Sequence, residues 1–360
     1  MNLGSSPSPA ASISGINDMT GNKKRIRIRD IADHLDVSTA TVSRALNPNT
    51  EHMIRKEVVA GIKDAARELG YIPSPIATAL RTDRTYTVGV AVPDILNPVF
   101  PPIINGIQDH LHQNGYLTLI VNTNNDQRVA LDEIRRLITR QVDGFILANA
   151  FLDDISVREC LLREIPMVLV NRSIKNGNLV HQVLSDDEFG IELAINHLAE
   201  LGHVRLLHLA GPPNILHGKQ RLKIFRQLCR KNKIQDEYMV MDAFSIDAGA
   251  RGAQQFLQQQ SKATAILAGN DLMAVGAMDT LRNAGVSVPE EISVVGFNDM
   301  PLSDMLRPAL TTISIPHMEF GNQAARLLLQ VIESPDISRQ LVLLTPKLVI
   351  RESTAKCRSR

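Results

Sequence analysis

The stretch that decides the fold of the N-terminal region is "IRDIADHLDVSTATVSRALN", residues 28–47. Its first half carries apolar residues at the spacing of one helical face, namely Ile28, Ile31, Ala32 and Leu35. Its second half repeats that spacing with Val37, Val42, Ala45 and Leu46, although Ser, Thr and Val are mediocre helix formers. Asp36 falls in the turn, and the Ser38 hydroxyl can cap the second helix by accepting a backbone N–H. The pattern therefore predicts two short helices joined by a tight turn.

The hydroxyl-rich face of the second helix indicates a partner. A third helix is predicted over "EVVAGIKDAARELGY", residues 57–71, and three short helices of this kind form a helix-turn-helix head. Thr39, Ala40 and Arg44 then share the outer face of the second helix. Short side chains let a helix enter the DNA major groove, where Arg pairs with guanine and Thr or Ala meets a thymine methyl group. The alternative is a Ser/Thr-rich surface helix with no partner.

Charge is unevenly distributed along the chain. Residues 21–84 hold 12 Lys/Arg against 8 Asp/Glu, whereas the net charge of the whole chain is only +1. The excess is concentrated at "KKRIRIR", residues 23–29. Such a run is often just a solvated segment, but it is also the electrostatic footprint of a nucleic-acid-binding protein.

From residue 85 onward, short apolar runs alternate with helical patterns. The runs come in two series: "YTVGVAVPD", "YLTLIVNT", "GFILAN" and "PMVLVN", then "VRLLHLAG", "YMVMDAF", "TAILAGND" and "ISVVGFND". Strands that are buried on both faces and separated by crossover helices form parallel sheets. Two such series predict two doubly wound α/β lobes with a cleft between them, at the carboxyl ends of the strands.

The rest of the composition excludes several classes of protein. No apolar run approaches the roughly 18–20 residues that a membrane span needs. Residues 1–24 lack the basic and apolar regions of a secretory signal, and their Ser/Pro/Gly/Asn content predicts a disordered tail. The three cysteines are widely scattered, which fits a reducing compartment better than a disulfide framework or a zinc site. We expect a cytoplasmic protein without membrane contact.

Two rival functions are compatible with the body alone. An extracytoplasmic sugar-binding protein would share the two lobes, but the absence of a signal and the basic helical head disfavour it. A nicotinamide-dependent enzyme would need G-x-G-x-x-G after a strand, which the sequence lacks, as it lacks a P-loop and a G-x-S-x-G elbow. We therefore expect no enzymatic activity, no cofactor and no metal.

The combined motifs resemble the lactose-repressor/galactose-repressor (LacI-type) family of transcription factors. The head and a following segment, "ELGYIPSPIATALRT", carry the resemblance together with "GVAVPDILNPVF", "AGNDLMAVGAM" and "SVVGFNDMPLSDMLRPALTTI". The resemblance implies an α/β fold with a helix-turn-helix head and a periplasmic-binding-protein-like body. The implied domains are a head at 25–73, a hinge helix and linker at 74–86 and an effector-binding and dimerisation domain at 87–356. The first lobe would take about 87–185 and 317–344, and the second about 186–314 and 345–356.

The resemblance also implies roles for individual residues. Thr39, Ala40 and Arg44 would read bases, and Ala77 and Leu80 of the hinge helix would enter the minor groove. Phosphates would be contacted by Ser38, Thr41, Ser43 and Asn47. The partners would be a pseudo-palindromic operator, a second copy of the chain and a small effector, whose binding either releases DNA or promotes its binding.

The effector is implied to be a sugar, sugar acid or sugar phosphate. Its predicted contacts are Asp94, Asn97, Phe100, Asn125, Arg172, His217, Arg221, Phe244, Asn270 and Asn298. Asn298 stands where sugar-binding relatives usually have Asp, which would leave Arg221, Arg172, His217 and Lys219 as a cationic excess favouring an anionic effector. Ile215 stands where purine-responsive relatives have Arg, which disfavours a nucleobase.

Two departures from the family concern the head. Asp36 replaces the usual Gly of the turn, and Asp tolerates the left-handed conformation that a turn requires. The third helix begins with "IRKEVVAG", where the family usually has a Ser cap and a Thr-Arg pair at positions 58–59. Val58 and Val59 cannot contact phosphate as that pair would.

Overall fold

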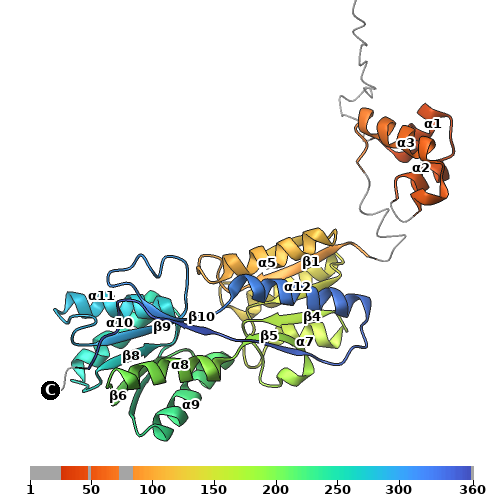
Figure 1. Cartoon of the computed structure of the whole chain (residues 1–360). Coiled ribbons are helices and arrows are strands. Elements are labelled where there is room, and N and C mark those ends of the chain that lie inside the picture. The colour runs from red at the N-terminus through yellow and green to blue at the C-terminus, as the bar shows by residue number, and fades with distance from the viewer. Residues whose placement is uncertain (1–25, 48–49, 73–83, 358–360) are drawn as a thin grey trace, which may run out of the picture. The chain divides into compact units, whose positions relative to one another are not determined.

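The computed structural model describes residues 26–47, 50–72 and 84–357, which fall into two compact units dividing at Asp83 (Figure 1). The predicted tail at 1–24 and the hinge residues Ala77 and Leu80 lie outside these residues. We describe the head and the body separately.

The head consists of three α-helices and one 3₁₀ turn. These are α1 (Ile28–Leu35), α2 (Thr39–Ala45), η1 (Glu51–Met53) and α3 (Lys56–Glu68). Their apolar faces meet in one core made of Ile31, Ala32, Val42, Ala45, Ile62, Ala65 and Ala66. Asp36 adopts the left-handed conformation, with φ 51° and ψ 47°, and the Ser38 hydroxyl accepts the Thr41 N–H at 3.1 Å. The tight turn and the cap expected from the sequence are both present.

The body contains two six-stranded sheets, each with helices on its faces. The first sheet has the order β11-β5-β4-β3-β1-β2 and the second β12-β10-β9-β8-β6-β7. Every pairing is parallel except that of β10 with β12. The strands are β1 (Thr87–Val92), β2 (Leu117–Asn122), β3 (Gly144–Leu147), β4 (Met167–Val170), β5 (His181–Ser185), β6 (Arg205–Ala210), β7 (Gln235–Val240), β8 (Ala265–Ala268), β9 (Ser293–Asn298), β10 (Thr311–Ser314), β11 (Leu341–Leu344) and β12 (Lys347–Val349). The predicted doubly wound architecture is confirmed.

Crossover helices link these strands. They are α5 (Phe100–Gln113), α6 (Gln127–Thr139), α7 (Ile155–Leu162), α8 (Asp187–Glu200), α9 (Leu216–Lys231), α10 (Ile246–Gln258), α11 (Asp271–Asn283) and α12 (His317–Glu333), with a 3₁₀ turn, η2, at Gly177–Leu179. The chain passes between the two sheets three times: after β5, after β10 and after β11. Each lobe is therefore assembled from separate parts of the sequence, and three crossing segments join them.

The bounds of β7 differ from the sequence prediction. The apolar run "YMVMDAF", residues 238–244, predicts a strand, but β7 covers Gln235–Val240. β7 is an edge strand of its sheet, and Tyr238 and Val240 are exposed on it. An edge strand is less completely covered than a central one, so its sequence is not a continuous apolar run.

Membrane insertion finds no support in the described part of the chain. Within residues 26–47, 50–72 and 84–357, no helix combines the length and apolar character that a bilayer crossing requires.

Candidate functional sites

The outer face of α2 is free in the head unit. Ser38, Thr39, Ala40, Ser43 and Arg44 are exposed, whereas Val42 and Ala45 on the opposite side are completely buried. Thr41 and Asn47 are half-buried, and the Thr41 hydroxyl lies 2.8 Å from that of Ser38. The core thus packs against one face of α2, and the residues predicted to face DNA lie on the opposite, exposed face.

The start of α3 is built differently from α2. Arg55 is its N-cap residue, and its side chain makes no capping hydrogen bond. Val58 and Val59 pack against the apolar core of the head. Their side chains therefore contribute to the packing of the head.

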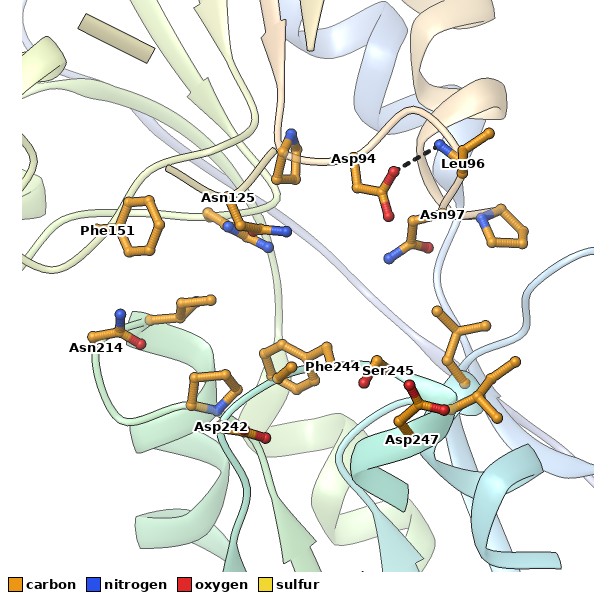
Figure 2. Close-up of a pocket in the computed structure, with 18 residues that line it drawn as sticks. Asp94, Leu96, Asn97, Asn125, Phe151, Asn214, Asp242, Phe244, Ser245 and Asp247 are labelled. Carbon is orange, nitrogen blue, oxygen red and sulfur yellow. Dashed lines mark hydrogen bonds between the residues drawn. The ribbon is translucent and has the colours of Figure 1, made fainter. Parts of the chain in front are cut away.

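A cleft of about 660 Å³ lies between the two lobes of the body, at the carboxyl ends of the strands (Figure 2). The first lobe lines it with Pro93, Asp94, Leu96, Asn97, Pro98, Asn125, Phe151 and Arg172. The second lobe lines it with Pro212, Asn214, Ile215, Asp242, Ala243, Phe244, Ser245, Ile246, Asp247 and Leu272. Two aromatic rings among convergent polar groups are typical of a small-molecule site.

Five of the ten residues predicted to contact the effector line this cleft: Asp94, Asn97, Asn125, Arg172 and Phe244. Two of them also shape the loop that carries them. Asp94 accepts the Leu96 N–H at 2.9 Å, as the dashed line in Figure 2 shows, and Asn97 accepts the Val99 N–H at 3.2 Å. Local hydrogen bonds of this loop therefore hold the side chains of Asp94 and Asn97 at the cleft.

Arg221 is not among the lining residues, because its guanidinium is held within the second lobe. Its Nε and Nη2 donate to the two carboxylate oxygens of Asp187, both at 2.9 Å. Its Nη1 donates to the Gly269 carbonyl at 3.0 Å, and the guanidinium carbon lies 3.6 Å from the centre of the Phe297 ring. The side chain braces α9 against α8 and the ends of β8 and β9.

Four other predicted residues are also absent from the lining. Asn270 caps α11 by accepting the Met273 N–H at 2.9 Å, and Phe100 is buried in the main core. Asn298 ends β9 with φ 115°. His217 packs on Phe244, with ring centres 5.0 Å apart, and burial holds its pKa well below the usual value. His217 is therefore neutral at physiological pH.

The cationic excess expected from the sequence does not form. Arg221 is paired with Asp187, His217 is neutral, and Lys219 is exposed outside the lining. Three carboxylates line the cleft instead, those of Asp94, Asp242 and Asp247. The expectation of an anionic effector assumed a free Arg221, and that assumption was wrong.

Arg172 is the cation of the lining, and it is 5% exposed. Within the described residues, its Nε and Nη1 have no hydrogen-bond partner. Burial lowers its pKa to about 10, while the nearby Asp154 carboxylate opposes that change. Arg172 is therefore charged at pH 7.

Sequence reasoning missed several lining residues, among them Phe151, Asn214, Asp242, Ser245 and Asp247. Most of them follow the carboxyl end of a strand: Phe151 comes after β3, Asn214 after β6 and Asp242 after β7. The rule that ligands bind at the carboxyl edge of a parallel sheet could have found them.

Comparisons with known proteins agree with this geometry. The head matches the family model "Bacterial regulatory proteins, lacI family" over residues 27–74, and the body matches a periplasmic binding protein-like domain over 195–354. The transcriptional repressor CytR of Escherichia coli is 34% identical over 91% of this chain and 96% of its own length. The ribose operon repressor of Halalkalibacterium halodurans is 32% identical over the same shares.

Solved structures extend the likeness to three dimensions. The lac repressor dimer bound to operator and the anti-inducer ONPF aligns with a TM-score of 0.83, at 27% identity, over 92% of this chain and all of that one. A LacI family regulator from Enterococcus faecium with bound ribose aligns with a TM-score of 0.67, at 30% identity, over 76% of this chain and all of that one.

Proposed function

The chain belongs to the LacI family of bacterial regulatory proteins, and from this premise we propose that it is a cytoplasmic, homodimeric repressor of transcription controlled by a neutral sugar. Sequence-specific DNA binding by the head and effector binding by the body are the two halves of this function. The observation that carries the proposal is that one chain contains both an exposed α2 face in the head and a cleft lined by both lobes of the body.

On the DNA side, we assign base reading to Thr39, Ala40 and Arg44. Arg44 is exposed at the last turn of α2, where its guanidinium can reach guanine O6 and N7. Phosphate positioning belongs to Ser38, Thr41, Ser43 and Asn47 in this assignment. Two copies of the chain would place two heads on the half-sites of a pseudo-palindromic operator.

On the effector side, the charges of the cleft favour a neutral ligand. Among the described residues that line the cleft, Arg172 is the one cationic side chain, against three carboxylates. Asp94, Asp242 and Asp247 would repel a phosphate or a carboxylate and would accept hydrogen bonds from hydroxyls. Phe151 and Phe244 offer flat apolar surfaces to the face of a sugar ring. The ribose operon repressor and the ribose-bound regulator point to the same class.

Fluorescence anisotropy tests the coupling of the two halves. The full chain would bind a labelled duplex selected from a random pool, and neutral pentoses and hexoses would then be added one at a time. We expect one sugar to change the DNA affinity at least fivefold, as typical coupling free energies require. Unchanged DNA binding with every sugar would reject the effector half of the proposal and leave the DNA-binding half standing.

A further inference from the structure

The first lobe has a second cavity, at the edge of its sheet opposite to the cleft. This cavity, of about 400 Å³, lies where two strands begin: Met167 is the first residue of β4 and His181 is the first residue of β5. The turn before β11 completes its wall with Pro335, Asp336 and Arg339. The cleft between the lobes lies at the carboxyl ends of the strands, and no residue lines both spaces.

Most of the wall of this cavity is apolar. It includes the side chains of Leu161, Ile165, Met167, Leu179, Val180 and Val331. The two carboxylates of the wall belong to Glu164 and Asp336, which are exposed, as is Arg339. A pocket with an apolar wall and a few polar groups favours a ligand with a hydrocarbon body and one polar end.

His181 lies in this wall between two hydrogen-bond donors, and it is 2% exposed. The Gln340 backbone N–H donates to its Nδ1 at 3.3 Å, and Nη1 of Arg339 lies 3.0 Å from its Nε2. Burial, and then the charge of Arg339, lower the pKa of His181, so the ring is neutral at pH 7. A neutral imidazole accepts at one nitrogen and donates at the other. Because Nδ1 accepts from Gln340, Nε2 carries the hydrogen and faces the guanidinium, donor against donor.

We propose that this cavity binds a small monocarboxylate with an apolar body, whose carboxylate lies between Arg339 and His181. A carboxylate oxygen can accept from both the Nε2–H and the guanidinium, which removes the contact between two donors. Arg339 donates its Nε–H to the Leu179 carbonyl at 3.2 Å, and among the described residues it forms no ion pair. Its charge is therefore available to an anion.

The charges of the wall favour a ligand with a single negative charge. Glu164 and Asp336 line the same cavity as Arg339. Two carboxylates would repel a phosphate dianion, whereas one cation balances the charge of one carboxylate. Such a ligand is additional to the sugar proposed as effector, because the two spaces have separate linings.

Titration of the full chain with 4-methylpentanoate tests the proposal, followed by NMR of ¹⁵N-labelled histidine side chains. The His181 Nε2 signal, identified by its absence in His181→Phe, should shift as its N–H gains an acceptor. The neutral comparison is 4-methylpentanamide, which has the same hydrocarbon body. The amide and inorganic phosphate should each bind at least tenfold more weakly than the acid, since neither has a single charge for Arg339 to balance.

Arg339→Gln should weaken binding of the acid at least tenfold, because it removes the cation and keeps a polar side chain. Arg339 is exposed, so this variant should keep the wild-type melting temperature. Arg158→Gln is the matched control, since Arg158 is exposed on α7 and does not line the cavity. Arg172→Gln removes the arginine of the cleft and should bind the acid as tightly as the wild type does.

Several results would overturn the proposal. An unchanged His181 signal, or equal binding of the acid and its amide, would reject the site on the wild-type protein alone. Equally tight binding of inorganic phosphate would reject the monocarboxylate class. Loss of acid binding in Arg172→Gln but not in Arg339→Gln would place the carboxylate in the cleft. Each of these failures leaves the proposed function standing, because DNA binding and sugar binding are measured separately.

Discussion

Two arginines of the body show what determines the role of a residue. The family resemblance implies that Arg221 and Arg172 are both effector contacts. Arg221 is held by Asp187, whereas Nε and Nη1 of Arg172 have no partner among the residues that the structure describes. Asp187 lies 34 positions from Arg221 in the sequence and meets it only because α8 packs against α9. A motif can identify the position of an arginine, but its hydrogen-bond partners come from the tertiary fold.

Arg44 is the residue whose loss should most directly affect base recognition. Arg44→Ala should cost about 1–3 kcal/mol of operator binding and relax base preference at one position of each half-site. Anisotropy with the operator and with single-base variants measures both effects. Arg67→Ala is the matched control, since Arg67 is exposed on α3 and paired with Asp64. An equal loss on every DNA sequence would indicate a phosphate contact instead.

His208 should make stability depend on pH. It is completely buried in β6, its Nδ1 lies 2.8 Å from the Leu267 carbonyl, and burial lowers its pKa to about 4 from 6.5. Because the pKa is lower in the folded state, its stabilising contribution is present above pH 6.5 and is lost as the pH falls toward 4. The free energy of unfolding should therefore change with pH over that window by about 3 kcal/mol less in a variant that lacks His208.

Urea unfolding of His208→Phe at several pH values checks this. Phe keeps the ring that packs against Phe225, where the centres are 5.0 Å apart. The variant should be less stable at pH 7, where it lacks the bond to Leu267, and should lose less stability than the wild type on acidification. Parallel pH curves for the two proteins would contradict the assignment.

Among helices and strands, the sequence predicts best those whose apolar pattern fits only one kind of element. The head helices, the Asp36 turn and the central strands of both sheets follow from periodicity and capping. β7 was misplaced because an edge strand lacks a continuous apolar run. β11 and β12 are edge strands that are only partly buried, and β10 has the sequence TTIS, so none of the three forms a buried apolar run. The sequence predicts where the cleft lies, but half of the residues predicted to contact the effector do not line it. Helix capping, ion pairing and core packing hold their side chains elsewhere.

The cap of α2 should be measurable on its own. Ser38→Ala removes the acceptor of the Thr41 N–H and should destabilise the helix by about 1 kcal/mol. Hydrogen exchange of the α2 amides should then become about fivefold faster. Ser43→Ala is the control, because Ser43 is exposed on the same helix and caps nothing. Equal exchange rates in the two variants would show that the Ser38 cap does not stabilise α2.

The packing of α5 against α12 depends on two glycines at their closest approach, where the helices lie side by side (Figure 1). A Cβ on Gly321 would lie 2.0 Å from the Ile103 carbonyl oxygen, and one on Gly106 would lie 2.1 Å from that of Met318. Gly321→Ala should therefore cost about 3 kcal/mol in urea unfolding, since backbone cannot move aside as a side chain can. Gly61→Ala, with nothing within 4 Å, should instead stabilise α3 slightly. A neutral Gly321→Ala would show that the helices separate freely.

At the scale of the molecule, the two units divide the function. The head has a small core and offers an exposed recognition face, whereas the body has two large sheets joined by three crossing segments around a cleft. A ligand held by both lobes can change the angle between them, because the crossing segments are the connections that must bend. The proposed function requires that effector binding in the body alters DNA binding by the two heads of a dimer.

Selection of bound duplexes from a random-sequence pool tests sequence-specific DNA binding most directly. The full chain and Arg44→Ala would be run in parallel at about physiological salt, where nonspecific phosphate binding is weak. We expect the wild type to enrich a palindrome with two half-sites and Arg44→Ala to lose one base preference in each of them. Folded wild-type protein that enriches no sequence would contradict the assignment of this chain as a sequence-specific repressor.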